Sequence, residues 1–133
     1  MLCEYRSNDR ECLAIMKERF EAIFAAANDE KNAVTVKMIG ERPCAGNVDE
    51  QAMRRLVDTC KQVVEEVSGA TTRQSPASTD CNIPLSLGIP AACIPTYEGS
   101  GAHTRGENLD KASLIPGLEI TIKAIAAILE VAL

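Results

Sequence analysis

The chain has 133 residues, of which 46% are apolar and 25% charged, and its formal net charge is −5. These values are typical of about one soluble globular domain. Aromatic residues make up only 3% and tryptophan is absent, so the core must be aliphatic. Because no basic patch is interleaved with aromatic residues, we do not expect nucleic-acid binding.

The first half of the chain predicts a strand, a helix and a second strand. Residues 2–6 are typical of a short strand, and Asn8 is a candidate cap for a helix that runs to about Ala27. Residues 33–39 alternate apolar and polar side chains, which predicts a half-buried strand. The apolar positions of the helix recur at spacings of three and four residues: Leu13, Met16, Phe20, Ile23, Phe24 and Ala27.

A break at residues 41–46, which contain Pro43 and Gly46, separates this unit from the rest of the chain. A capping box at Asn47 and Glu50 predicts the next helix, and Gly69 is suited to end it. Short strands are predicted at 71–73 and 91–94, with a short helical segment at 78–87 between them. This alternation indicates a layered α/β domain.

The last predicted helix reaches Leu133 and has Pro116 near its start. It is largely apolar, so we expect it to pack against a sheet. Glu119, Lys123 and Glu130 project onto one side, which indicates an amphipathic helix and no membrane span.

The predicted compartment is the cytoplasm. The N-terminus has no basic segment followed by an apolar run, so it does not predict a signal peptide. Six cysteines form no C-x-x-C pair and no disulfide or zinc-ribbon spacing, which favours reduced thiols.

Three groups of residues are candidates for a binding site. Ser78, Thr79 and Asp80 open a helical segment, where backbone N–H groups are available to an anion. His103, the only histidine, follows a glycine-containing stretch a few residues after the predicted strand at 91–94. Arg6 ends the first predicted strand and could bind a carboxylate with two hydrogen bonds.

These segments resemble motifs of a known enzyme family. Residues 78–84 (STDCNIP) and 87–91 (LGIPA) resemble two linked motifs of the zinc-dependent amidohydrolases and exopeptidases. That family includes acetylornithine deacetylase, succinyl-diaminopimelate desuccinylase, carboxypeptidase G and peptidase T. Residues 101–104 (GAHT) resemble the segment with the family's last metal-binding histidine. Residues 5–7 (YRS), on a strand before a long helix, resemble the end of its lid or dimerisation domain.

The resemblance implies a fold and a domain plan. Residues 1–43 would be the C-terminal piece of an α+β lid domain, a strand–helix–strand unit. Residues 44–133 would be the C-terminal part of a three-layer α/β catalytic domain, with helices packed on a mostly parallel sheet. The whole protein would be a homo-oligomer, because lid domains of this family dimerise. The composition and charge pattern described above predict that it is cytoplasmic and binds neither nucleic acid nor a membrane.

The resemblance also implies a reaction and roles for individual residues. The parent enzyme would hydrolyse the amide bond of a peptide or N-acyl amino acid with metal-activated water. It would use one or two zinc ions, with cobalt or manganese as alternatives. His103 would bind a metal ion, while Arg6, Ser78 and Thr79 would hold the substrate carboxylate or amide. Asp80 would be a carboxylate near His103 that does not bind the metal ion itself.

The sequence departs from the family pattern in one large respect. The H-x-D motif, the bridging aspartate, the Glu-Glu pair and a further metal ligand of the family have no counterpart here, and His103 is the only imidazole. A catalytic zinc site normally uses three protein ligands. We therefore expect a fragment without catalytic residues of its own, which is inactive alone and does not hold zinc tightly. Gly106-Glu107-Asn108 replaces an acidic residue followed by Glu-Trp, which predicts a looser loop.

Simpler interpretations stand beside these roles. Asp80 could instead be a helix N-cap or a buried polar anchor, and Ser78 and Thr79 could only form hydrogen bonds at the start of that helix. Arg6 could form a surface ion pair of little energetic value. The rival function is a non-catalytic α/β association module that pairs through residues 2–6 or 33–39. A cysteine-based redox protein is a third alternative, and it would need a thiol of lowered pKa.

Overall fold

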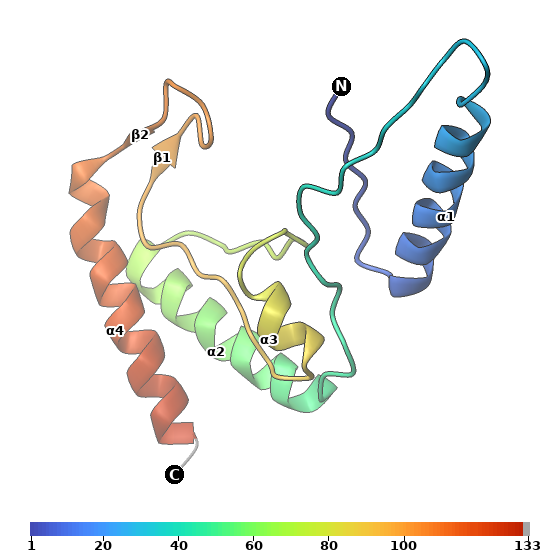
Figure 1. The fold of residues 1–133 in the computed structure, drawn as a ribbon. Helices are drawn as coiled ribbons and strands as arrows, with labels where there is room; N and C mark the ends of the chain where they lie inside the picture. Colours follow the sequence, from blue (N-terminus) through green and yellow to red (C-terminus); the bar gives the residue numbers. More distant parts are fainter. Residues whose placement is uncertain (132–133) are drawn as a thin grey trace.

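The structure is a computed structural model that describes residues 1–131 (Figure 1). The last two residues of the predicted C-terminal helix, 132 and 133, lie outside the described residues. The elements in chain order are α1 (Arg10–Ala26), α2 (Glu50–Ser68), α3 (Asn82–Ser86), β1 (Gly99–Ser100), β2 (Asn108–Leu109), the 3₁₀ turn η1 (Lys111–Ser113) and α4 (Leu114–Val131).

All four predicted helices are present, with three corrections at their starts, and the shortest, α3, begins at Asn82 and not at residue 78. Asp9 caps α1, where Asn8 was predicted, because its carboxylate accepts a hydrogen bond from the Cys12 amide at 2.8 Å. Asp49 caps α2 in place of Asn47 by accepting from the Ala52 amide. Gly69 ends α2 with φ of 68°, a left-handed conformation that glycine adopts without a steric penalty.

The predicted strands at 2–6, 33–39, 71–73 and 91–94 are not strands in the described chain. Within residues 1–131 the only sheet is the antiparallel pair of β1 and β2. A strand exists only when a neighbour completes its hydrogen-bond ladder, and here none of the four segments lies in a ladder. The three-layer arrangement therefore stays a prediction.

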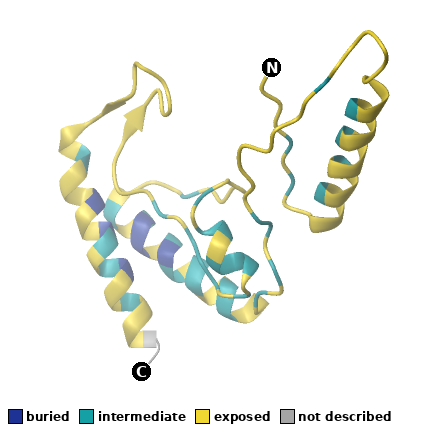
Figure 2. Ribbon diagram, viewed as in Figure 1, coloured by how far each residue is buried: buried dark blue, intermediate teal, exposed yellow. Residues whose placement is uncertain are grey.

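The core lies between α2 and α4, which pack side by side (Figure 1). Figure 2 shows that the buried residues are confined to these two helices. The buried apolar side chains are small or medium in size: Cys60, Val63 and Val64 on α2, and Ile120 and Ala124 on α4. Such a small core is marginal for a domain of this length, because the hydrophobic term scales with buried apolar area.

An ion-pair cluster at the edge of this core joins the same two helices. The Nζ atom of Lys123 on α4 lies 2.9 Å from a carboxylate oxygen of Glu66 on α2 and 3.0 Å from one of Glu119. The hydrogen bonds to Glu66 and then to Glu119 raise the pKa of Lys123. Its side chain is 40% exposed, so the contribution of the cluster to stability is small.

Most of the apolar surface of α4 faces away from α2 and is uncovered. Ile115 is 79% exposed, and Leu118, Ile122, Ile125 and Leu129 are exposed as well. The predicted sheet under this helix is not among the described residues. By length and composition alone, the segment Lys111–Glu130 is also apolar enough to cross a membrane, a test that core helices of soluble proteins pass too.

Helix α1 stands apart from the other helices (Figure 1) and has no buried residue. Its aromatic side chains pack on one another and on Tyr5, with ring centroids 5.0 Å apart for Tyr5 and Phe20. Two polar contacts tie this end of the chain to the break at 41–46. The Arg10 guanidinium donates to the Ala45 carbonyl at 3.4 Å, and the Cys44 thiol lies 3.6 Å from the Ser7 carbonyl oxygen.

Gly117 in the first half of α4 is a tight point of the fold. It is buried, and a Cβ atom at this position would collide with the backbone carbonyl of Thr96. The segment that leads to β1 can cross α4 this closely only because residue 117 has no side chain.

This contact yields a prediction that opposes helix propensity. In an open helix, Gly→Ala stabilises by about 1 kcal/mol. For Gly117→Ala we expect the free energy of unfolding to fall by about 1–3 kcal/mol, because the methyl group overpacks the Thr96 backbone. Urea unfolding followed by circular dichroism measures the change. Gly40→Ala is the matched control, since nothing lies near a Cβ at residue 40, and a stabilised Gly117→Ala would contradict the contact.

Candidate functional site

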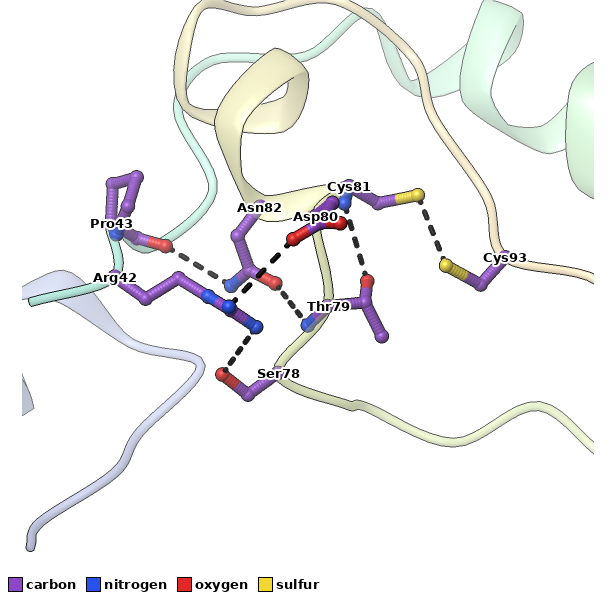
Figure 3. Close-up of polar contacts among 8 residues, drawn as sticks. All are labelled: Arg42, Pro43, Ser78, Thr79, Asp80, Cys81, Asn82 and Cys93. Carbon is purple, nitrogen blue, oxygen red and sulfur yellow. Dashed lines mark hydrogen bonds and ion pairs between the residues drawn. The ribbon is translucent and has the colours of Figure 1, made fainter. Parts of the chain in front are cut away.

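The turn at residues 78–82 is held against the break at 41–46 (Figure 3). The side chain of Asn82 makes the main link. Its Nδ2 atom donates to the Pro43 carbonyl at 3.0 Å, and its Oδ1 atom accepts from the Thr79 amide at 2.9 Å. A primary amide suits this position because it is both donor and acceptor. Two segments that are far apart in the sequence thereby form one surface.

Arg42 lies beside the same turn. Its Nη1 atom is 3.5 Å from the Ser78 hydroxyl oxygen, and its Nη2 atom is 3.7 Å from a carboxylate oxygen of Asp80. Both distances are long for charge-assisted contacts, and the Asp80 side chain is fully exposed. The guanidinium is therefore loosely held at the surface beside a hydroxyl group.

The structure contradicts the simpler interpretation of Asp80 and agrees with that of Thr79. Asp80 does not cap α3, since Cys81 occupies the cap position without a side-chain hydrogen bond, and Asp80 is no buried anchor. Thr79 does bond the start of the helix, because its hydroxyl accepts from the Cys81 amide at 3.3 Å.

His103 lies on the exposed loop between β1 and β2. Thr104 closes the loop by donating from its amide and its hydroxyl to the Gly101 carbonyl at 3.0 and 2.6 Å. Glu107 turns back and accepts from the His103 amide at 3.2 Å. The loop is thus organised by its own polar groups, and the imidazole extends from it into solvent.

The backbone at His103 has φ of 64°, the only positive value at a non-glycine residue in the described chain. This left-handed conformation is uncommon for residues with a side chain, although histidine tolerates it better than most. It costs free energy of order 1 kcal/mol, and strain of this kind gathers at binding sites. The loop therefore holds its imidazole in a conformation that local propensity does not favour.

Arg6 does not join either group. Its guanidinium pairs with Glu4, with 2.7 Å between Nη2 and Oε1, and this hydrogen bond raises the pKa of Arg6. Both side chains are exposed. In the described structure Arg6 forms the surface ion pair that the simpler interpretation predicts.

The residues of the described chain do not make a metal site by themselves. Among residues 1–131, no group of three or more histidine, cysteine, aspartate or glutamate side chains could hold a metal ion. No hydrogen bond or ion pair in this part of the chain joins Asp80 to His103. An open depression of about 340 Å³ lies beside the loop and is lined by Tyr97, Ser100 and Glu107 among others, but not by Ser78, Thr79 or His103.

Sequence reasoning missed Arg42 and Asn82. The residues around Arg42 and Pro43 predict only a boundary, although their carbonyl groups need hydrogen-bond donors like any others. Asn82 lies two residues after the polar run 78–80 at a predicted helix start, a position where side-chain amides often bond backbone groups. That signal was present in the sequence.

The bridge made by Asn82 predicts a stability difference within the site. For Asn82→Ala we expect the free energy of unfolding to fall by about 1–3 kcal/mol, because the Pro43 carbonyl and the Thr79 amide lose their partly buried partner. For Arg42→Gln we expect a loss below about 1 kcal/mol, because its contacts are long and exposed. Urea unfolding of both variants gives the comparison, and equal losses would contradict the assignment of Asn82 as the main link.

Comparisons of this chain with protein-family models, curated proteins and solved structures found no match, so the family resemblance remains a prediction from the motifs.

Proposed function

We propose that this chain forms the C-terminal part of a metal-dependent hydrolase that cleaves the amide bond of a peptide or an N-acyl amino acid. The observation that carries the proposal is the loop of His103, which presents the only imidazole of the chain on a strained, exposed backbone. The motif resemblance of residues 78–91 and 101–104 gives the proposal its reaction class.

In this proposal His103 contributes one ligand to a metal site, and the other ligands come from outside the described residues. The chain alone is then neither active nor a tight zinc binder, because one imidazole falls short of the usual three protein ligands. The uncovered face of α4 would be the surface on which the sheet of the intact catalytic domain lies. Residues 1–43 would belong to a lid, in keeping with the separate position of α1.

Arg42 takes over the role that the sequence assigned to Arg6. A substrate carboxylate near the Ser78 hydroxyl could replace the 3.7 Å contact with Asp80 by shorter, charge-assisted hydrogen bonds to the guanidinium. Thr79 is occupied by the helix start, so Ser78 is the better candidate of the two hydroxyl groups.

The single histidine makes the metal proposal directly measurable. Zinc added to the reduced chain should shift the proton resonances of the imidazole only at high zinc concentration. Zinc that binds to the cysteine thiols instead leaves those resonances unshifted. Zinc affinity should be the same in His103→Ala within error, because the thiols dominate any binding by the chain alone. Tight, stoichiometric binding that His103→Ala removes would contradict the incomplete site. Asp80→Asn is the control and should leave the zinc dependence of the imidazole resonances unchanged.

The direct test of the reaction class uses a polypeptide that extends this chain at its N-terminus. We expect the extension to include an H-x-D motif and the longer protein to hydrolyse N-acyl amino acids or peptides with zinc. His103→Ala should then abolish turnover without unfolding the protein. An extension without any cluster of metal ligands would end the proposal.

The second candidate is an association module, favoured by the apolar residues of 33–39. Val36, Met38 and Ile39 are exposed, and no strand of the described chain pairs with this segment. An unpaired segment with a strand pattern is a template for an identical one, so the occupant would be residues 33–39 of a second copy.

Association of this kind predicts a concentration-dependent dimer. Light scattering after size-exclusion chromatography should show a dimer that Val36→Pro weakens at least ~10-fold, because proline removes a ladder donor. Glu30→Pro in the preceding turn is the control, because the hydrogen bonds of that turn are donated by the Asp29, Lys31 and Asn32 amides and not by Glu30. A monomer at all concentrations would count against the module.

A further inference from the structure

Two cysteines meet beside the turn at 78–82. The Sγ atoms of Cys81, at the start of α3, and Cys93, on the segment between α3 and β1, lie 3.3 Å apart (Figure 3). A disulfide bond is about 2.05 Å long, so small rotations of the two side chains would bring the sulfur atoms to bonding distance. Among the described residues this is the only contact between two thiols.

The backbone between the two cysteines explains why they meet. Helix α3 ends in a reversal at Gly88, whose φ of 81° is left-handed. The Ile89 amide donates to the Pro84 carbonyl at 2.9 Å, and the Gly88 amide donates to the Leu85 carbonyl at 3.1 Å. The chain therefore turns back along α3 and brings residue 93 beside residue 81. The fold of this segment, and not sequence proximity alone, brings the two thiols into contact.

The two thiols differ in their access to solvent. Cys93 is exposed, whereas Cys81 is half-buried. Desolvation first, and then the hydrogen bond with Cys93, raise the pKa of the Cys81 thiol, so it stays protonated at neutral pH. An oxidant in solution reaches Cys93 more readily. Cys60 is buried in the core, where burial raises its thiol pKa, and it has no such access.

We propose that Cys81 and Cys93 form a reversible disulfide in the presence of a small-molecule disulfide such as oxidised glutathione. The Cys93 thiolate attacks one glutathione sulfur, breaks the glutathione S–S bond and releases one glutathione thiolate. Cys81 gives its proton to solvent and attacks the sulfur of Cys93 in the mixed disulfide. That step releases the second glutathione thiolate. Two protein thiols are oxidised to one disulfide, and one glutathione disulfide is reduced to two thiols.

The bond would fix the turn that holds Ser78, Thr79 and Asp80 to the segment that leads to the His103 loop. It would close a short chain loop across the α3 reversal, which restricts the unfolded chain as well as the folded one. In a reducing cytoplasm such bonds are usually transient and respond to the redox state. This site does not depend on the proposed hydrolase activity.

Peptide mapping offers an unambiguous readout. Trypsin cuts after Arg73 and Arg105 and nowhere between them, so Cys81 and Cys93 fall in one peptide, residues 74–105. Each of the other four cysteines falls in a different peptide. A bond between Cys81 and Cys93 therefore appears as a single peptide that has lost two hydrogens and resists alkylation. Any other disulfide joins two peptides.

The experiment equilibrates the folded chain with mixtures of reduced and oxidised glutathione, quenches with iodoacetamide and maps the peptides. We expect peptide 74–105 with its internal disulfide to form at lower oxidised glutathione than any other disulfide. The same equilibration in concentrated urea should lower the effective concentration of the pair at least ~10-fold, because the α3 reversal is lost. Cys12→Ser removes an exposed thiol of α1 and should leave the result unchanged.

Two outcomes would overturn the proposal. One is a peptide 74–105 that stays reduced or carries glutathione separately on both cysteines under conditions that oxidise other thiols of the chain. The other is an internal disulfide that forms equally well in urea, since the folded geometry would then play no part. Both outcomes are read from the wild-type chain, so they do not require a cysteine variant to fold.

Discussion

The structure depends on the packing of α2 against α4. Val63 and Val64 on one helix and Ile120 and Ala124 on the other make the only buried cluster of the described chain. These side chains are small or medium in size, and none is aromatic, which limits the apolar area removed from water. The break at 41–46 leads into α2, and the His103 loop leads into α4 through η1. The α3 turn is held to that break by the hydrogen bonds from the Gly46 amide to Leu85 and from Asn82 to Pro43. The geometry of these segments is only as firm as a core of a few aliphatic side chains allows.

The helices could be predicted from the sequence because the features that make them are local. The apolar spacing of α1, the glycine at the end of α2 and the proline in the first turn of α4 each act within a few residues. The exact caps were less certain, since Asn8 and Asp9, or Asn47 and Asp49, are almost equally good. In both cases the aspartate next to the first turn accepts the amide hydrogen bond.

The strands and the site partners could not be predicted in the same way because they depend on distant residues. Residues 33–39 have a strand pattern, but a pattern cannot supply a neighbouring strand. The sequence indicated the turn at 78–80 and the loop of His103, and both are exposed local structures in the fold. It did not indicate that Arg42 lies beside Ser78, because 36 residues separate them and only the folded chain brings them together.

The uncovered face of α4 has a consequence for the life of this chain in a cell. A helix with Ile115, Leu118, Ile122 and Ile125 open to water is the kind of surface that chaperones bind and that marks a protein for degradation. The amount of the chain in a cell would then depend on two competing rates, the rate at which the α4 face is covered and the rate at which chaperones and proteases recognise it. That face could be covered by more of the same polypeptide or by another molecule. In either case it must be covered before the quality-control proteins bind it.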